Sequence, residues 1–327
     1  MRRWSSLSRL AAPRFVALLL AFAASSALAQ GYPNRPVRVI VGYPPAGVTD
    51  LVARLIGPKL AEIWSQPVVV ENRPGAAGVI AGAFVAKSPP DGYTLFVHGG
   101  FAENAALHAS LSYDPLQDFV HVAPLASQPY VLCASPASGV RSVAQLIAAA
   151  RARPGELNYS SAGIGGGTHL TAEKFRLAVG IDAVHIPYKG GAEAVTNTVA
   201  GRNTYGFSTI PIVLTQIREG RLVALGVTSP QRSSQLPDVP TIAEAAVPGF
   251  EGTFWIGLWA PARTPPDVVE KISRDATNAV AAPEVRERLA QLGSEPMAMS
   301  PAEFEEFVRR EIEETSRIVK AAGIKPQ

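Results

Sequence analysis

The chain has 327 residues, a formal net charge of +3 and a single cysteine, Cys133. A single thiol excludes an intramolecular disulfide, and we interpret Cys133, in the apolar run YVLCAS, as a buried small hydrophobic residue. No Lys/Arg cluster beyond the N-terminal segment offers the basic face of a nucleic-acid-binding protein, so we expect no nucleic-acid partner.

The first 29 residues have the pattern of a cleavable secretory signal peptide. Four arginines precede a short apolar core, FVALLLAFAA (15–24), and the small residues ALA (27–29) precede Gln30. The core is too short for a comfortable membrane span, which disfavours the alternative of an uncleaved anchor. Cleavage after Ala29 would leave 26 basic and 27 acidic residues, a net charge of −1. We therefore expect an exported chain located in a bacterial periplasm.

Strands and helices alternate along the remaining 298 residues. The apolar runs predict strands at 37–45, 67–75, 93–100, 119–135, 157–163, 183–188, 204–210, 222–229 and 255–265. Helical periodicity predicts helices from 48 to 63 and at 76–87, 142–154, 168–180, 191–201, 213–221, 266–282, 283–293 and 301–323. This alternation predicts parallel sheets covered on both faces, and the length favours two domains.

Glycine-rich turns follow several of the predicted strands. They are YPPAGVTD (43–50), NRPGAAG (72–78), HGG (98–100), SSAGIGGGT (160–168) and PYKGG (187–191). Ligands of such sheets bind beyond the carboxyl ends of the strands. Two domains that face each other across a cleft would bring these turns together. Each turn could also serve backbone geometry alone, because glycine is common where a strand passes into a helix.

Known catalytic and nucleotide-binding motifs are incomplete. SSAGIGGGTHL has no lysine after its glycines, as a phosphate-binding loop would need, and Thr168 takes the place of the last glycine of a dinucleotide fingerprint. Tyr159 stands where a serine-hydrolase elbow around Ser161 needs glycine. No histidine pair has i,i+4 spacing, so the signal for a metal is weak, and we expect no cofactor.

Two polar residues near these turns have alternative interpretations. His169, in the first turn after the glycine loop, either packs on that loop or contacts a ligand. Asp50, in the first turn of its predicted helix, favourably meets the helix dipole, and we expect this structural role, because a carboxylate would repel an anionic ligand.

An ordered set of motifs resembles the Bug family, also called the TctC family. These proteins are the substrate-binding components of tripartite tricarboxylate transporters. The set runs from YPNRPVRVIVGYPPAGVTDLVAR through VVVENRPGAAGVIAG, SPPDGYTL, YDPLQDF, LNYSSAGIGGGTHL, HIPYKGG and LPDVPTIAEA to GLWAPARTP. It covers nearly the whole mature chain. Two departures concern the ligand: Ala46 replaces the first glycine of the usual Y/F-P-P-G-G turn, and Thr204 and Tyr205 stand where Gly-x-Val-Asp is common.

The resemblance implies a type II periplasmic-binding-protein fold, with two doubly wound α/β domains around a ligand cleft. It implies a discontinuous first domain (30–127 and 254–327), a second domain (128–253), and crossings in LASQPYVL and EGTFWIGLWAP. The ligand contacts that it implies in the first domain are Tyr43, Ala46, Gly47, Val48, Thr49, Gly75, Ala76, Ala77, Gly99 and Gly100. Those in the second domain are Ser160, Ser161, Gly165, Gly167, Thr168, His169, Tyr188, Lys189, Phe207 and Ser208.

The function implied is capture of a small carboxylic acid, mainly by backbone N–H groups, and its delivery to the membrane permease subunits of a tripartite transporter. The expected protein is a monomer and not an enzyme. One alternative is a ligand-loaded partner of a membrane sensor kinase, and another is an exported serine hydrolase that uses Ser160 or Ser161. The sequence does not separate delivery from sensing, because both use the same closed cleft.

Overall fold

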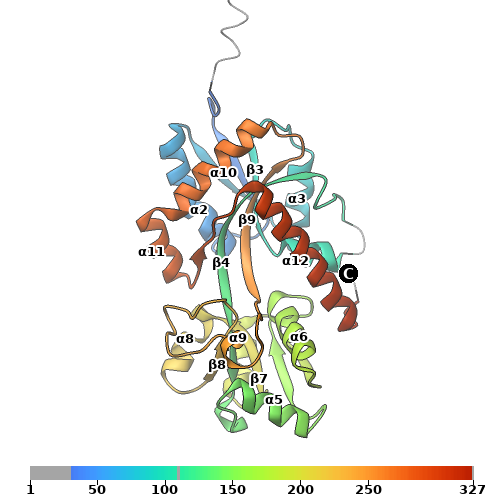
Figure 1. Cartoon of the computed structure of the whole chain (residues 1–327). Helices are drawn as coiled ribbons and strands as arrows, with labels where there is room; N and C mark the ends of the chain where they lie inside the picture. The colour runs from blue at the N-terminus through green and yellow to red at the C-terminus, as the bar shows by residue number, and fades with distance from the viewer. Residues whose placement is uncertain (1–30, 109–110, 326–327) are drawn as a thin grey trace, which may run out of the picture.

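Two lobes joined by two long strands make up the computed structural model (Figure 1), which describes residues 31–108 and 111–325. The predicted signal peptide, residues 1–29, lies outside the described residues. Within the described ranges, none of the helices combines the length and the apolar character that a membrane crossing needs. We refer to the lobe that contains residues 31–108 as the upper lobe, and to the other as the lower lobe.

The upper lobe is built on a mixed sheet. Strand β1 pairs in parallel with β2 and β3, β3 pairs antiparallel with β9, and β9 pairs antiparallel with β4. A short strand, β10, adds to β4. The strands are β1 (Val37–Val41), β2 (Val68–Asn72), β3 (Thr94–Gly99), β4 (Phe119–Ala134), β9 (Thr253–Pro261) and β10 (Glu295–Pro296).

The long strand β4 belongs to both lobes. Its first part, from Phe119 to Pro129, pairs with β9, and its last part, from Tyr130 to Ala134, pairs with β7 and β8 of the lower lobe. In the lower lobe, β5 pairs in parallel with β6 and β7. The remaining strands are β5 (Asn158–Ser161), β6 (Val184–Pro187), β7 (Tyr205–Thr209) and β8 (Val223–Val227).

Helices cover the sheets of both lobes. In the upper lobe they are α2 (Val48–Trp64), η1 (Ala76–Gly78), α3 (Val79–Ala86), α4 (Phe101–Leu107), α10 (Pro266–Ala281), α11 (Pro283–Gln291) and α12 (Pro301–Ala321). In the lower lobe they are η2 (Pro136–Ser138), α5 (Val143–Ala152), α6 (Gly167–Val179), α7 (Gly191–Val199), α8 (Ile210–Arg218) and α9 (Ile242–Ala245). The long helix α12 starts at a capping box between Ser300 and Glu303, and it contacts α4 and β4 as well as α6 of the lower lobe.

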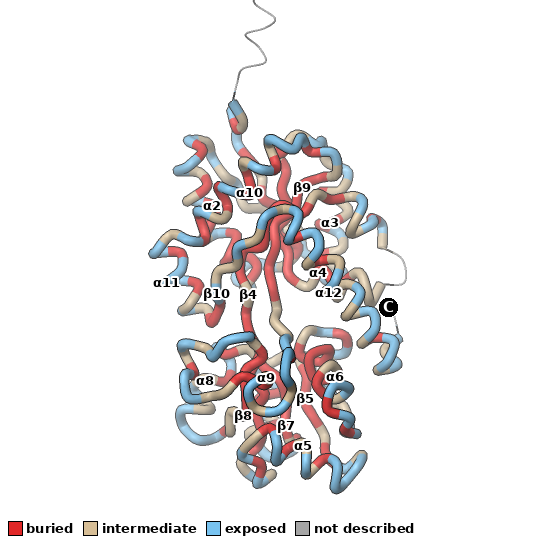
Figure 2. Tube along the Cα trace, in the orientation of Figure 1, coloured by how far each residue is buried: buried red, intermediate tan, exposed pale blue. Residues whose placement is uncertain are grey.

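Each lobe has its own apolar interior, and the buried segments of Figure 2 concentrate on the sheets. Val39, Leu95 and Leu258 are among the fully buried side chains of the upper lobe, and Tyr159 and Phe175 among those of the lower lobe. Each predicted strand and helix is observed in the predicted order, with the first strand ending at Val41 rather than at Pro45. The elements α4, α9 and β10 were not predicted. Cys133 is a buried free thiol, as predicted.

Candidate functional site

The turn after β1 opens α2 and borders a cavity of about 500 Å³. Its lining residues are Tyr43, Pro44, Pro45, Ala46, Gly47, Val48, Thr49 and Phe254. Five residues predicted from the resemblance are therefore brought together here, with Phe254 from β9. Ala46 has φ +69°, a left-handed conformation that glycine adopts at lower cost.

Asp50 holds this turn from inside the protein. It is 1% exposed, and its Oδ2 accepts a hydrogen bond from the Ala46 N–H at 2.8 Å. Arg54 and Asn72 also donate hydrogen bonds to its carboxylate. Burial raises the pKa of Asp50, but these hydrogen bonds outweigh burial, so the pKa lies below its ordinary value. The structural role predicted for Asp50 is thus observed.

Two further glycine turns lie beside it in the upper lobe. The turn at Gly75–Gly78 contains Ala76 and Ala77 at φ +45° and +51°, and Asn104 Nδ2 donates a hydrogen bond to the Ala77 carbonyl at 2.9 Å. Gly99 and Gly100 end β3 and cap α4. Tyr43 donates a hydrogen bond to the Gly99 carbonyl at 2.8 Å, which joins this turn to the first one.

In the lower lobe, the glycine loop runs from β5 into α6. Thr168 Oγ1 accepts a hydrogen bond from the Ala162 N–H at 2.9 Å, and His169 Nδ1 accepts one from the Gly165 N–H at 3.0 Å. Both side chains are buried, so they hold the loop from within. The side chain of His169 therefore packs on the glycine loop, which is the first of its two interpretations. The first N–H groups of α6, at Gly167 and Thr168, have no acceptor within the helix, as at any helix start.

Ser161 and His185 form a close pair below this loop. Ser161 Oγ lies 2.6 Å from His185 Nε2, and Ser161 is fully buried. Among the residues that the structure describes, no carboxylate is hydrogen-bonded to His185. The other serine, Ser160, is also buried and lies 2.9 Å from Thr198 Oγ1. A fully buried serine, paired with a histidine to which no described carboxylate is hydrogen-bonded, differs from the exposed, activated nucleophile of a serine hydrolase.

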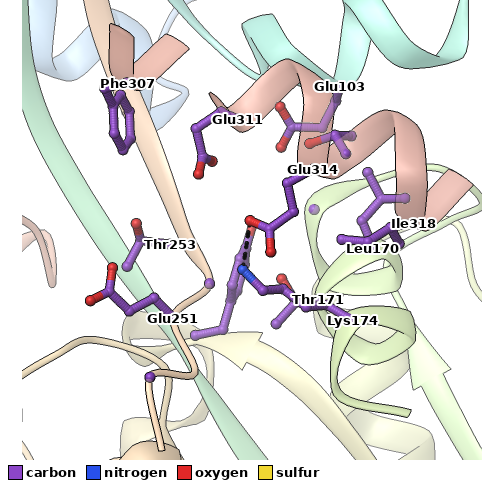
Figure 3. Close-up of a pocket in the computed structure, with 15 residues that line it drawn as sticks. Glu103, Leu170, Thr171, Lys174, Glu251, Thr253, Phe307, Glu311, Glu314 and Ile318 are labelled. Atoms are coloured by element: carbon purple, nitrogen blue, oxygen red, sulfur yellow. Dashed lines mark hydrogen bonds and ion pairs between the residues drawn. The ribbon is translucent and has the colours of Figure 1, made fainter. Parts of the chain in front are cut away.

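A second cavity of about 250 Å³ lies between the lobes (Figure 3). It is lined by Glu103, Tyr130, Gly167, Leu170, Thr171, Lys174, Gly249, Glu251, Gly252, Thr253, Phe307, Glu311, Glu314, Thr315 and Ile318. These residues come from α4, α6 and α12 and from the two crossing strands with the segment before β9. Of the predicted residues, only Gly167 is on this list.

Side chains of the upper lobe and of β4 approach Gly167 closely in this cavity. A β-carbon on Gly167 would collide with the Tyr130 hydroxyl and would lie 3.8 Å from Glu103 Oε1. A β-carbon on Gly165 would lie 2.9 Å from Leu107 Cδ1. The glycine loop of the lower lobe therefore lies against α4 of the upper lobe, and burial there raises the pKa of Glu103 to about 7.

The other predicted residues of the lower lobe are placed differently. Phe207 is 2% exposed and packs on Phe175 in the core. Ser208 is buried on β7, and no hydrogen-bond partner of its hydroxyl is present among the described residues. Tyr188 is half-buried, and its hydroxyl accepts a hydrogen bond from Asn203 Nδ2 at 3.0 Å. Lys189 is exposed, and its backbone N–H donates a hydrogen bond to Glu193.

Sequence reasoning missed Glu103, Tyr130 and Phe254. Glu103 follows the predicted glycines Gly99 and Gly100 by a few residues, but it has the sequence pattern of an ordinary acid in a first helical turn. Tyr130 and Phe254 lie in the two segments predicted as crossings, where either could have been a core residue. No group of three or more His, Cys, Asp or Glu residues within the described part of the chain is arranged to hold a metal ion.

A family model described as the tripartite tricarboxylate transporter family receptor, TctC, matches residues 52–324. Protein BugT of Bordetella pertussis is 36% identical over 323 residues, which cover 98% of this chain and 99% of BugT.

Solved structures of two solute-bound proteins are also similar to this chain. Rpa4515 of R. palustris, solved with adipate, has a TM-score of 0.74 and 34% identity, covering 91% of this chain and all of that one. MatC from Rhodopseudomonas palustris, solved with bound malate, has a TM-score of 0.69 and 31% identity, covering 88% of this chain and all of that one. The predicted two-lobed α/β fold around a cleft is confirmed.

Proposed function

Because the chain belongs to the TctC family of tripartite tricarboxylate transporter receptors, which includes the Bug proteins, we propose that it is a periplasmic solute-binding protein. It captures a small carboxylic acid between its lobes and delivers the acid to the membrane permease subunits of a tripartite tricarboxylate-type transporter. It acts as a monomer, performs no catalysis, and is exported through a signal peptide cut after Ala29.

One observation carries the proposal: the glycine loop that opens α6 in the lower lobe lines the interlobe cavity at Gly167, together with Glu103 of α4 in the upper lobe. Gly167, at the start of the 13-residue helix α6, lies against Glu103, and Gly99 and Gly100 precede Glu103 in α4. Unpaired N–H groups and the helix dipole make the start of α6 favourable for a carboxylate. The ligands named for Rpa4515 and MatC, adipate and malate, support a carboxylic acid.

We propose that the ligand is bound by the twenty residues that the family resemblance implies, mainly through their backbones. The side chains of Ser160, Ser161, Thr168 and His169 already have partners within the lower lobe. Their contribution is therefore to fix the loop whose N–H groups face the ligand. We also propose the domain boundaries 30–127 with 254–327, and 128–253, so that β4 and β9 connect the two domains.

The test starts with the freshly purified mature protein. Native mass spectrometry before and after denaturation identifies any co-purified acid. Thermal melts then compare C4 to C6 di- and tricarboxylates, amino acids and aromatic acids with phosphate and ATP. A ligand at a hundred times its Kd stabilises the folded state by about 2.7 kcal/mol. Stabilisation by ATP and by no acid would reverse the assignment.

Transport itself needs a cellular measurement. Deletion of the gene should abolish uptake of the acid that the protein binds, and re-expression should restore it. Normal uptake in the deletion strain, with loss of a transcriptional response to the acid, would favour the sensor-partner alternative instead.

A further inference from the structure

The interlobe cavity of Figure 3 carries an excess of negative charge. Its lining includes four carboxylates, Glu103, Glu251, Glu311 and Glu314. Lys174 is the one ammonium group among the lining residues, and it already pairs with Glu314 at 2.8 Å. A ligand that carries only carboxylates would therefore meet like charge on entering.

Three of the four carboxylates have an evident partner or contact with solvent. Glu314 pairs with Lys174, Glu311 Oε2 accepts a hydrogen bond from Trp255 Nε1 at 3.2 Å, and Glu251 is exposed. Glu103 is different. Across residues 31–108 and 111–325, neither an ion pair nor a hydrogen bond from another side chain reaches its carboxylate.

The Glu103 carboxylate lies between the glycine turns of the two lobes. Its Oε2 lies 3.7 Å from the position of a β-carbon on Gly100, and its Oε1 lies 3.8 Å from that of a β-carbon on Gly167. The N–H groups that open α6 are thus within a few ångströms of an unpaired acid. One end of a molecule bound there would face the positive potential at the start of α6, and another part of it would lie beside the Glu103 carboxylate.

We infer that the ligand of this chain is a carboxylic acid that also carries a positively charged amino group, and that Glu103 binds the amino group. The inference rests on the proposed function, whose site it shares. The ligand carboxylate meets the start of α6, and the amino group, one or two carbons away, meets Glu103. Glu103 is then a residue that determines specificity, because it attracts amino acids and repels acids that have no amino group.

The electrostatics of Glu103 agree with this role. Burial, opposed by a hydrogen bond from its own backbone N–H and assisted by the nearby Glu311, raises its pKa to about 7. Glu103 is half-buried and has no counter-ion within the described residues, which is costly, and an ammonium group of a ligand would supply the missing charge. The charge pair forms only when the ligand is bound.

The test is calorimetric titration of the mature protein at pH 8, after bound ligand has been removed, with matched pairs of acids. L-Aspartate is compared with L-malate, L-glutamate with 2-hydroxyglutarate, and each other amino acid with its hydroxy analogue. We expect at least one amino acid to bind ten times or more tightly than its analogue. Glu103→Gln should remove that preference. Glu313→Gln, the same change at an exposed position of α12, should leave it intact.

The other outcomes overturn the inference and separate it from the proposed function. Equal binding of analogue and amino acid, unchanged in Glu103→Gln, would contradict the inference and leave a carboxylate-binding protein. Binding of amine-free acids that tightens as the pH falls through 7, and that is lost in Glu103→Gln, would make Glu103 a neutral hydrogen-bond donor instead. Binding of none of these acids by a correctly folded protein would contradict the proposed function itself. Circular dichroism establishes the folding of each variant.

Discussion

The imidazole rings of His169 and His185 stack face to face, with centroids 3.8 Å apart and planes 9° from parallel. His169 accepts the Gly165 N–H, and His185 lies within hydrogen-bonding distance of Ser161. The stack therefore supports the glycine loop from below. Two stacked cations would repel each other, so the arrangement favours neutral rings.

Acid should weaken the protein through this pair. Burial lowers the pKa of His169, and burial together with the neighbouring His169 lowers the pKa of His185 to about 4. In the unfolded chain both titrate near about 6.5. The stability from the neutral stack is therefore complete above about pH 6.5 and is lost as the pH falls toward 4, because only the unfolded chain binds the protons. Thermal melts from pH 7.5 to 4.5 should show a falling Tm.

Matched variants isolate the contribution of the pair. His185→Gln should have a lower Tm at pH 7.5 but a flatter dependence on pH than the wild type. His108→Gln, for a histidine that lies apart from the stack at the end of α4, should follow the wild-type slope. Parallel curves for wild type and His185→Gln would show that the stack is not what titrates.

Ala46 offers a stabilising change. Its φ of +69° costs a residue with a β-carbon roughly 1–2 kcal/mol, whereas glycine loses about 0.4–1 kcal/mol through a more flexible unfolded chain. Ala46→Gly should therefore raise the free energy of unfolding by about 0.5 kcal/mol, measured by urea denaturation. Ala148→Gly, at an exposed position within helix α5, should instead lower it by about 1 kcal/mol. A loss of stability in Ala46→Gly would mean that the turn relaxes without strain.

Asn104 should be needed for the shape of the Gly75–Gly78 turn. It is 5% exposed, and its Nδ2 contacts the Ala77 carbonyl and, at 3.1 Å, His98 Nε2. Asn104→Ala leaves both groups without this donor, which should cost about 1–3 kcal/mol of unfolding free energy and weaken binding of the acid.

The control for Asn104 is Asn197→Ala. The amide of Asn197 donates to the Glu193 carbonyl at the surface of α7, so its loss should change the free energy of unfolding by at most about 0.5 kcal/mol. Equal effects of the two substitutions would refute a special role of Asn104.

Much of the fold could be predicted because its signals are local. Apolar runs such as Val37–Val41 and glycine turns such as Gly163–Gly167 show their structure within a few residues of sequence. Two features could not be predicted from the sequence: the contact between Glu103 and Gly167, and the His169–His185 stack. Each depends on how elements that are distant in the sequence pack together. The buried hydroxyl of Thr168 illustrates the same limit: its residue type favoured ligand contact, but its partner, Ala162 N–H, is set by the path of the loop.

Gly167 should tolerate no side chain. A β-carbon there would collide with the Tyr130 hydroxyl, inside the interlobe cavity. Gly167→Ala should therefore weaken binding of the acid identified by mass spectrometry at least tenfold, and Gly167→Val should weaken it more. Thr168→Ala should weaken binding of the acid by about 0.5–1.5 kcal/mol, because it removes the one hydrogen bond with which the Thr168 hydroxyl holds the Ala162 N–H. Lys189→Ala should change the affinity little, because Lys189 is exposed.

A rescue variant distinguishes loss of fit from general damage. Tyr130→Phe removes the oxygen that the new β-carbon would strike, so Gly167→Ala combined with Tyr130→Phe should bind more tightly than Gly167→Ala alone. Each protein is titrated calorimetrically with the same acid, and its unfolding is measured in parallel, so that a misfolded variant is recognised. Abolished binding in Lys189→Ala together with intact binding in Gly167→Val would mean that a cation binds the carboxylate. The collision at Gly167 would then not affect the affinity, and the glycine loop would not be the main element that binds the acid.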